Sequence, residues 1–171
     1  MGSEVDTKRI VYPYIPEGRT IEYVAADNFF INLAKKFARL ASLDEVHPTG
    51  TVIARGPTVM GFGANGSGYH KHNECERKKR KIPTGQGYEL CEGCHPKNHS
   101  EQRALEDAVR KGGITDGSDL YLWGHWWCCN WCWDAINKAK IGRVYLLEGS
   151  EVMFNNKHPD NIIGRQFKDS A

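Results

Sequence analysis

The sequence predicts an α/β protein with a layered sheet, for three reasons. Segments with the two-residue period of strands alternate with segments that have the period of helices, which is typical of that class. The chain of 171 residues is long enough to form one domain with a substantial core. No internal repeat and no linker divides it, so we expect a single domain over residues 1–171.

The N-terminal part of the chain is expected to hold an extended segment followed by one long helix. Residues 1–20 contain Pro13 and Pro16, which interrupt regular structure. Between Asp27 and Ser42 the apolar residues recur at helical spacing, and Asp27 is a suitable N-cap. The apolar positions that predict this amphipathic helix are Phe29, Phe30, Leu33, Phe37 and Leu40.

Two short strands follow, and after them comes a long irregular segment. Thr51–Ala54 and Thr58–Phe62 have the composition of strands, with Gly56–Pro57 as the turn between them. Residues 64–98 are polar, basic and rich in glycine, cysteine and histidine, without the period of a helix or a strand. A loop of that length inside a compact domain is usually functional or tied by a metal.

The second half of the chain is expected to alternate between helix and strand. The predicted order is helix, strand, helix and strand, at about His99–Lys111, Asp119–Gly124, Cys129–Lys140 and Arg143–Glu148. Gly112 and Gly113 end the first of these helices. The tail from Gly149 is expected to be loop-like, with one short element near Asn161–Phe167.

Composition and charge place the chain among ordinary soluble proteins. Hydrophobic residues make up 40% and charged residues 26%, and no apolar run is long enough to cross a membrane. The polar N-terminus lacks the apolar core of a signal peptide, so we expect a cytoplasmic protein. A net charge of +2 neither requires nor excludes a nucleic-acid partner. The basic run Glu76–Lys81 is either a solvated loop or a contact for phosphate.

The cysteines of the chain indicate metal binding. There are six of them, all at or after residue 75: Cys75, Cys91, Cys94, Cys128, Cys129 and Cys132. Without a signal peptide disulfides are not expected, and clustered cysteines in a reducing compartment are typical of metal ligands. Three of the six lie in "GHWWCCNWCW", residues 124–133, whose tryptophans are expected to form the core and walls around a site.

Two short motifs, each at the start of a predicted helix, together indicate a catalytic zinc site. The first is His99-Ser100-Glu101, and the second is the Cys-x-x-Cys pair Cys129 and Cys132. A catalytic zinc takes three protein ligands and leaves its fourth position to water, and His99, Cys129 and Cys132 supply those three. Helix N-termini favour thiolates, and zinc lowers the pKa of its water. Glu101 lies two residues beyond the histidine, where it can exchange protons with that water.

The order of these motifs resembles that of the zinc-dependent cytidine and deoxycytidylate deaminase superfamily, whose signature is H-x-E followed by P-C-x-x-C. Here the motifs read "HSE" and "CCNWC", and the resemblance covers roughly residues 25–150. It implies a three-layer αβα sandwich around a mixed five-stranded sheet, and hydrolytic removal of an exocyclic amine. Cys128 stands where the family usually has proline, so Cys128 with Cys132 is an alternative ligand pair to Cys129 with Cys132.

Within that superfamily the chain is most similar to deoxycytidylate deaminases. "GFGANGSG", residues 61–68, resembles their G-Y-N-G-S segment, which implies that Asn65 contacts the sugar of a nucleotide and that Ser67 reaches its phosphate. The alternative is a plain Asn-Gly turn. The long insert, about residues 66–97, is also typical of that branch. The implied activity is conversion of dCMP to dUMP and ammonia, by an enzyme that self-associates.

The insert is expected to hold a second, structural zinc, as it does in some deoxycytidylate deaminases. It contains a second Cys-x-x-Cys pair, and histidines lie close to it in the sequence. A closed site needs four such ligands. The candidates are Cys75, Cys91, Cys94, His70, His72 and His95. The alternative is a loop with free thiols.

Two other functions remain open at this point. One is a deaminase of another base, such as a free nucleoside, guanine, or cytosine in single-stranded nucleic acid. Lys78–Lys81 and the tryptophans would suit a strand-binding channel, although the modest net charge makes nucleic acid the less favoured partner. The other is a non-catalytic zinc-binding module, which would have no use for Glu101.

Overall fold

A mixed five-stranded sheet, with strand order β1-β5-β4-β2-β3, forms the centre of the computed structural model, which describes residues 12–168. The strands are β1 (Ile21–Val24), β2 (Gly50–Arg55), β3 (Thr58–Ala64), β4 (Asp119–Trp123) and β5 (Val144–Leu147). Strands β1, β5 and β4 run parallel, whereas β2 is antiparallel to both β4 and β3. The mixed sheet implied by the resemblance is therefore confirmed.

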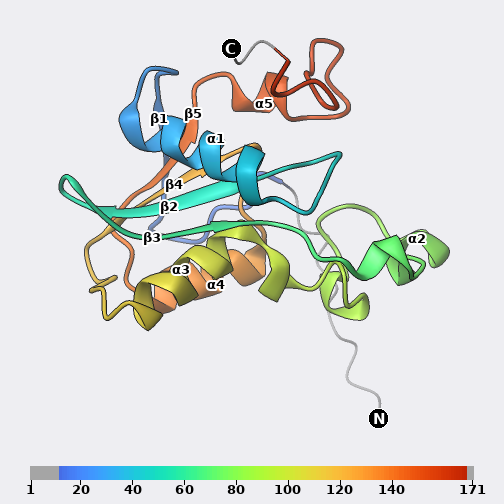
Figure 1. Ribbon diagram of the computed structural model, residues 1–171, viewed down its shortest axis with the longest axis horizontal. Helices are drawn as coiled ribbons and strands as arrows, with labels where there is room; N and C mark the ends of the chain where they lie inside the picture. The colour runs from blue at the N-terminus through green and yellow to red at the C-terminus, as the bar shows by residue number, and fades with distance from the viewer. Residues whose placement is uncertain (1–11, 169–171) are drawn as a thin grey trace.

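Helices cover both faces of this sheet, which gives three layers (Figure 1). Helix α1 (Phe29–Ala41) lies on one face, and α3 (Ser100–Arg110) and α4 (Asn130–Lys138) lie on the other. The short helix α5 (Ser150–Met153) and the segment after it pack on the α1 side. The predicted αβα sandwich is confirmed.

Helix α1 has a different N-cap and a different buried face from those expected. Asn28, rather than Asp27, is the N-cap, because its Oδ1 accepts the backbone N–H of Ile31 at 3.0 Å. Phe29 and Leu40 were expected on the apolar face but are 67% and 68% exposed. The helix buries smaller residues instead, and its fully buried positions are Ile31, Ala34 and Ala38.

Glycines in the strands let both helical layers lie directly on the sheet. A Cβ added to Gly50 in β2 would lie 2.0 Å from the backbone oxygen of Ala34 in α1. On the other face, a Cβ on Gly61 or Gly63 in β3 would lie 2.6 Å from backbone atoms of Ala104 in α3. Such distances exclude any larger residue without a shift of the helix. The alternate glycines of β3 therefore determine how closely α3 approaches the sheet.

Two elements near the ends of the chain differ from the sequence-based expectation. Strand β1 was not predicted, because it is a half-exposed edge strand of only four residues and carries no clear alternation. In the tail, the short element lies at Ser150–Met153 rather than near residues 161–167, which form turns. Elements this short are stabilised by their packing and leave little periodic signal.

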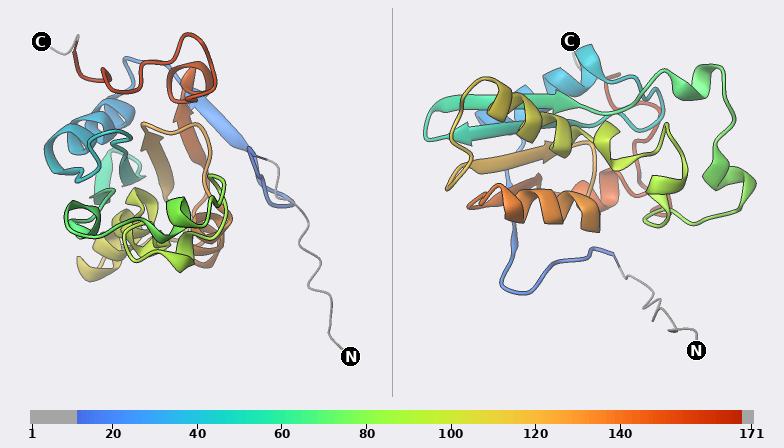
Figure 2. Two further views of the ribbon diagram at one scale, coloured as in Figure 1. Left: turned by 90° about the vertical axis from the view of Figure 1, so that its right-hand side faces the viewer. Right: turned by 90° about the horizontal axis from the view of Figure 1, so that it is seen from below.

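The insert after β3 forms an irregular lobe beyond the end of the sheet (Figure 2). It contains one helical turn, α2 (Glu76–Lys79), and the three 3₁₀ turns η1 (Tyr69–Lys71), η2 (Tyr88–Leu90) and η3 (Pro96–Asn98). The base of the lobe is closed where the N–H of Gly66 donates to the backbone oxygen of Asn98 at 3.0 Å. Among residues 12–168, no helix is long and apolar enough to cross a membrane.

Candidate active site

The start of α3 is fixed to the sheet by buried hydroxyl groups. Ser100, the first residue of the helix, is fully buried, and its Oγ lies 3.0 Å from Oγ1 of Thr49 and 2.8 Å from Oγ1 of Thr51. His99 precedes it as the N-cap residue, with extended backbone angles of φ −77° and ψ 145°. The imidazole is therefore held at the end of a helix whose position the sheet determines.

The start of α4 brings two cysteines to the same place. Cys129 is the N-cap of this helix, and its Sγ accepts the backbone N–H of Cys132 at 3.4 Å. The turn that leads into the helix begins at Gly124, whose φ of +97° favours glycine. A Cβ at Gly124 would lie 2.3 Å from the backbone oxygen of Pro48, so this turn packs directly on the segment before β2.

Together the two helix starts form a group that fits zinc. His99 Nδ1 lies 3.4 Å from Sγ of Cys129 and 3.4 Å from Sγ of Cys132, and the three ligand atoms all lie within 4.8 Å of one another. Neighbouring ligands of a tetrahedral zinc are roughly 3.3–3.8 Å apart for bonds of about 2.0–2.3 Å. Oε2 of Glu101 lies 3.6 Å from Sγ of Cys132. Cys128 is buried beside this group, but among the described residues it is not one of its members.

The electrostatics of the group favour a bound cation. A hydrogen bond from Cys132 and, after it, one from His99 lower the pKa of the Cys129 thiol to about 5, against the opposing effect of burial. Burial raises the pKa of Cys132 well above its usual value, with Cys129 adding to the effect. The protein alone therefore stabilises only one thiolate of the pair. A divalent metal would stabilise both, since thiolates are the form that binds zinc.

Two further titratable groups lie close to this cluster. Glu101 is 6% exposed, and burial raises the pKa of its carboxyl. The Nδ1 atom of His125 accepts the backbone N–H groups of Trp126 at 2.9 Å and Trp127 at 3.2 Å, so the ring proton is on Nε2. Burial first, and then the charge of His99, lower the pKa of His125 to about 3. His125 is therefore a neutral hydrogen-bond donor across the pH range in which enzymes usually work.

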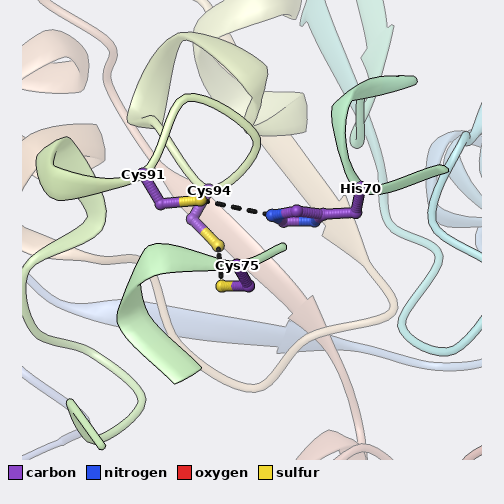
Figure 3. Close-up of side chains that lie close together, drawn as sticks. All are labelled: His70, Cys75, Cys91 and Cys94. Atoms are coloured by element: carbon purple, nitrogen blue, oxygen red, sulfur yellow. Dashed lines mark hydrogen bonds between the residues drawn. The ribbon is translucent and has the colours of Figure 1, made fainter. Parts of the chain in front are cut away.

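A second group of metal-binding side chains lies in the insert (Figure 3). Its four members, His70, Cys75, Cys91 and Cys94, point toward one another, and their ligand atoms all lie within 4.8 Å of one another. Nε2 of His70 is 3.2 Å from Sγ of Cys91, and the sulfurs of Cys75 and Cys94 are 3.6 Å apart. We call these four residues the Cys-rich group. Three thiols and one imidazole suit a closed tetrahedral zinc site.

Two of the six candidates for a second zinc lie outside this group. His95 instead caps η3, where its Nδ1 accepts the backbone N–H of Lys97 at 3.1 Å. His72 is exposed and is not a member of either group among the described residues. All six cysteines are free thiols.

Comparison with known families shows which family the chain belongs to. Residues 24–148 match the family described as "Cytidine and deoxycytidylate deaminase zinc-binding region", and both motifs fall inside the match. The chain belongs to this family. It is therefore a zinc-dependent deaminase, with two groups of His and Cys side chains that could hold zinc. No curated protein matches the chain.

Several solved structures are similar to the chain at low identity. The apo dCMP deaminase of the cyanophage S-TIM5 is 20% identical, with 68% of this chain and 78% of that chain covered and a TM-score of 0.46. The same phage enzyme in complex with dCMP and dUMP is 19% identical, with 71% and 82% covered and a TM-score of 0.47. RibD of Acinetobacter baumannii is 18% identical over 69% of this chain and 27% of its own, with a TM-score of 0.41.

In this deaminase the Asn65 side chain links three segments near the site. Its Oδ1 accepts the N–H of Thr49 at 2.8 Å and the hydroxyl of Ser42 at 2.5 Å, and its Nδ2 donates to the backbone oxygen of His47 at 2.9 Å. An amide nitrogen has two hydrogens, and the second one on Asn65 has no partner among residues 12–168. Ser67 lies two residues on, and its Oγ accepts the N–H of Tyr69 at 3.3 Å.

Sequence reasoning missed the role of two arginines around the deaminase site. Nη2 of Arg103 donates to Oδ1 of Asn98 at 3.1 Å and its Nη1 donates to the backbone oxygen of Ala64 at 2.9 Å, which ties the end of β3 to the turn before His99. Arg77 belongs to the basic run but points inward, over the ring of Tyr88. A charge run gives no indication of which of its members turns toward the protein.

Proposed function

We propose that this deaminase converts dCMP to dUMP with release of ammonia. The observation that supports the proposal best is the cluster of His99, Cys129 and Cys132 with the carboxyl of Glu101 beside it. These three residues would hold the zinc, which supplies the Lewis acidity that makes a water molecule nucleophilic near neutral pH. The donor set fits, because the thiols and the imidazole have the spacing of a tetrahedral site.

Glu101 is proposed as the group that moves protons. It would take a proton from the attacking water, deliver one to N3 of the cytosine ring, and pass one to the leaving amine. Burial raises the pKa of the Glu101 carboxyl above its usual value, which makes the carboxylate a stronger proton acceptor, as this role requires. Its position in the first turn of α3 keeps it directed at the same place as His99.

Substrate recognition is assigned to the edge of the site formed by the β3–η1 turn. The free N–H of Asn65 is proposed to bind the sugar, and Ser67 is proposed to reach the phosphate. The backbone of Gly66 bonds to Asn98, directly before His99, so this turn adjoins the ligand histidine. The phage enzyme bound dCMP and dUMP, which is consistent with a nucleotide substrate.

The insert is proposed to bind a second, structural zinc through the Cys-rich group. We expect two zinc ions per chain by metal analysis. His70→Asn should reduce this to one, whereas His72→Asn, two residues away and outside the group, should leave two. An unchanged zinc content in the His70→Asn protein would contradict this ligand assignment.

Three remaining expectations become part of the proposal. Residues 1–171 are proposed to form one deaminase domain, with its core at about residues 25–150. The free thiols are consistent with a reducing compartment such as the cytoplasm. Self-association into a homo-oligomer is tested by light scattering of the purified chain, and a monomeric mass would contradict it.

The deciding experiment is a deamination assay on the purified, zinc-loaded protein. It compares dCMP with dCTP, deoxycytidine, cytosine, guanine and a short cytosine-containing single strand, with products scored by mass. A clear preference for dCMP is expected, and Ser67→Ala should raise the KM for dCMP more than the KM for deoxycytidine. Turnover of only the strand or guanine would refute the dCMP assignment. No turnover of any compound by the zinc-loaded protein would refute this set of substrates.

A further inference from the structure

Tyr88 lies between the two metal-binding groups and contacts the ring of His99. Its side chain is 9% exposed. Its ring meets the His99 ring edge-on, with centroids 5.0 Å apart and an interplanar angle of 85°. Trp131, from the first turn of α4, lies against the same tyrosine with centroids 5.7 Å apart. Close packing of this kind limits the orientations that are open to the His99 ring.

The guanidinium group of Arg77 also packs on the ring of Tyr88. Its guanidinium carbon lies 4.4 Å from the centroid of the Tyr88 ring. Nε of Arg77 donates to the backbone oxygen of Gln86 at 2.9 Å, and its Nη2 donates to that of Pro83 at 2.8 Å. Its Nη1 donates to Sγ of Cys94 at 3.7 Å. One cation therefore joins the loop before Tyr88 to a member of the Cys-rich group.

The short elements that carry these two side chains begin or end at members of the same group. Helix α2 bears Arg77 and starts directly after Cys75, which is its N-cap. The turn η2 bears Tyr88 and ends at Cys91, which is its C-cap. Neither element is long enough to be stable alone. Bringing Cys75 and Cys91 onto one metal would therefore fix the positions of Arg77 and Tyr88 as well.

A second link runs through the backbone from the Cys-rich group to His99. Cys94 is separated from His99 only by His95 and the turn η3. The chain segment that ends the Cys-rich group therefore runs directly into the ligand histidine. Metal bound by the Cys-rich group would also limit where the His99 backbone can lie.

From these contacts we propose that Tyr88 is a positioning residue that fixes the His99 ring for zinc binding, and that metal in the Cys-rich group holds Tyr88 in place through Arg77. The proposal rests on the proposed function, because it takes His99 as a ligand of the catalytic zinc and the Cys-rich group as a second zinc site. Loss of a partner that orients a metal ligand typically costs about 10–100-fold in metal affinity or activity. Among residues 12–168, the Tyr88 hydroxyl accepts the N–H of Gly85 and makes no hydrogen bond to His99, so the ring is the part that positions His99.

Zinc affinity of the full chain, measured by competition with a chromophoric chelator, tests the proposal independently of activity. The wild-type protein is expected to release two zinc ions in separate steps. The step that disappears in Cys129→Ser belongs to the catalytic group, and the step that disappears in Cys75→Ser belongs to the Cys-rich group. If the two groups are linked, the zinc affinity of the catalytic group in Cys75→Ser should be about 10-fold lower than in the wild-type protein.

Substitution of Tyr88 separates positioning from simple packing. Tyr88→Leu should lower the zinc affinity of the catalytic group by about 10-fold and should also lower kcat. The zinc affinity of the Cys-rich group and the KM for dCMP should stay unchanged. Tyr88→Phe should have the wild-type zinc affinity and the wild-type kcat. Arg77→Ala should also lower the zinc affinity of the catalytic group. Arg80→Ala is the matched control, because Arg80 is an exposed arginine on the same segment. Among residues 12–168 its side chain pairs with Glu76 alone.

Several results would overturn the proposal. One is a folded Tyr88→Leu protein whose catalytic group binds zinc with wild-type affinity. Another is a Tyr88→Phe protein whose catalytic group binds zinc as weakly as that of Tyr88→Leu. If Tyr88→Leu fails to fold by circular dichroism, Arg77→Ala carries the same comparison. If the catalytic group of Cys75→Ser binds zinc with wild-type affinity, the link between the two groups is refuted. A wild-type protein that binds both zinc ions but deaminates nothing would refute the proposed function alone, since the affinities still report on Tyr88.

Discussion

Oε2 of Glu101 lies 3.6 Å from Sγ of Cys132, although the two residues stand 31 positions apart and belong to different helices. Both side chains are buried, in the first turns of α3 and α4. If His99, Cys129 and Cys132 held a zinc ion, a carboxyl at this distance would be close enough to exchange protons with its water without being one of the three ligands. This relationship is the basis of the first prediction.

Glu101→Gln should abolish most of the activity and leave the metal bound. The amide keeps the size of the side chain but cannot accept and return a proton, so kcat is expected to fall by about 10²–10⁴-fold. Product mass and zinc content are measured on the same sample. Glu106→Gln, on an exposed face of the same helix, is the matched control and should behave as wild type. Full activity in Glu101→Gln would contradict the proposed mechanism.

The adjacent cysteines Cys128 and Cys129 should respond differently to substitution. Cys129→Ser is expected to lose the catalytic zinc and all turnover, because its Sγ lies beside the imidazole of His99. Cys128→Ala should keep the zinc, since Cys128 is buried but lies outside the cluster. Zinc content after exhaustive dialysis compares the two. Loss of zinc only in the Cys128 variant would restore the alternative ligand pair of Cys128 and Cys132.

Gly63→Ala should destabilise the fold and with it the site. The added Cβ would lie 2.6 Å from backbone atoms of Ser100 and Ala104, so α3 would have to move away from β3. Overpacking of this kind costs about 1–3 kcal/mol in the free energy of unfolding, measured by urea denaturation. Gly68→Ala is the control, because no atom lies within 4 Å of a Cβ there and its φ is −72°. Equal stability of the two variants would contradict the tight contact between β3 and α3.

The stability of the fold should depend on pH through Asp107. Burial raises the pKa of this carboxyl, but bonds from Lys111, Arg110 and the N–H of Phe62 outweigh it and keep the pKa below its usual value. A carboxyl with a lowered pKa stabilises the fold above its unfolded-state pKa, and this stabilisation is lost as the pH falls through the folded-state value. Asp107→Asn should therefore reduce the free energy of unfolding at pH 7 by about 1–3 kcal/mol.

The same difference should begin to shrink as the pH falls below about 4, where the carboxyl protonates in the unfolded state, and should be lost once the pH has fallen through the lowered folded-state pKa. Urea denaturation at several pH values measures this change. Asp116→Asn replaces an exposed aspartate and should show little difference at any pH. A stability difference for Asp107→Asn that stays constant down to pH 2 would show that the charge of Asp107 does not contribute.

The long elements and the catalytic motifs were predictable because their signals are local. The amphipathic period of α1, the glycines after α3 and the H-x-E and C-x-x-C spacings can all be read within one stretch of chain. Strand β1 was missed because it has four residues and lies at the edge of the sheet. The expected apolar face of α1 was wrong at Phe29 and Leu40, because close approach to Gly50 favours the small residues Ala34 and Ala38.

The sequence could not predict which of the candidate ligands form the Cys-rich group. Six candidate ligands could be named from residue type, yet the structure gathers His70 with the three cysteines and places His72 and His95 elsewhere. Alternation and helical period give no information here, because the segment that carries these residues contains only single turns. Which side chains converge depends on how the turns pack on one another.

The residue types and the short spacings within each motif are determined by the sequence alone. They were enough to predict zinc-dependent deaminase chemistry and an α/β fold. The distances between motifs, the inward direction of Arg77 and the contact of Tyr88 with His99 arise only when distant segments pack together. Side chains within one turn are held close by the backbone, whereas those 10 or more residues apart are brought together by burial and close packing. Such contacts are therefore properties of the folded protein.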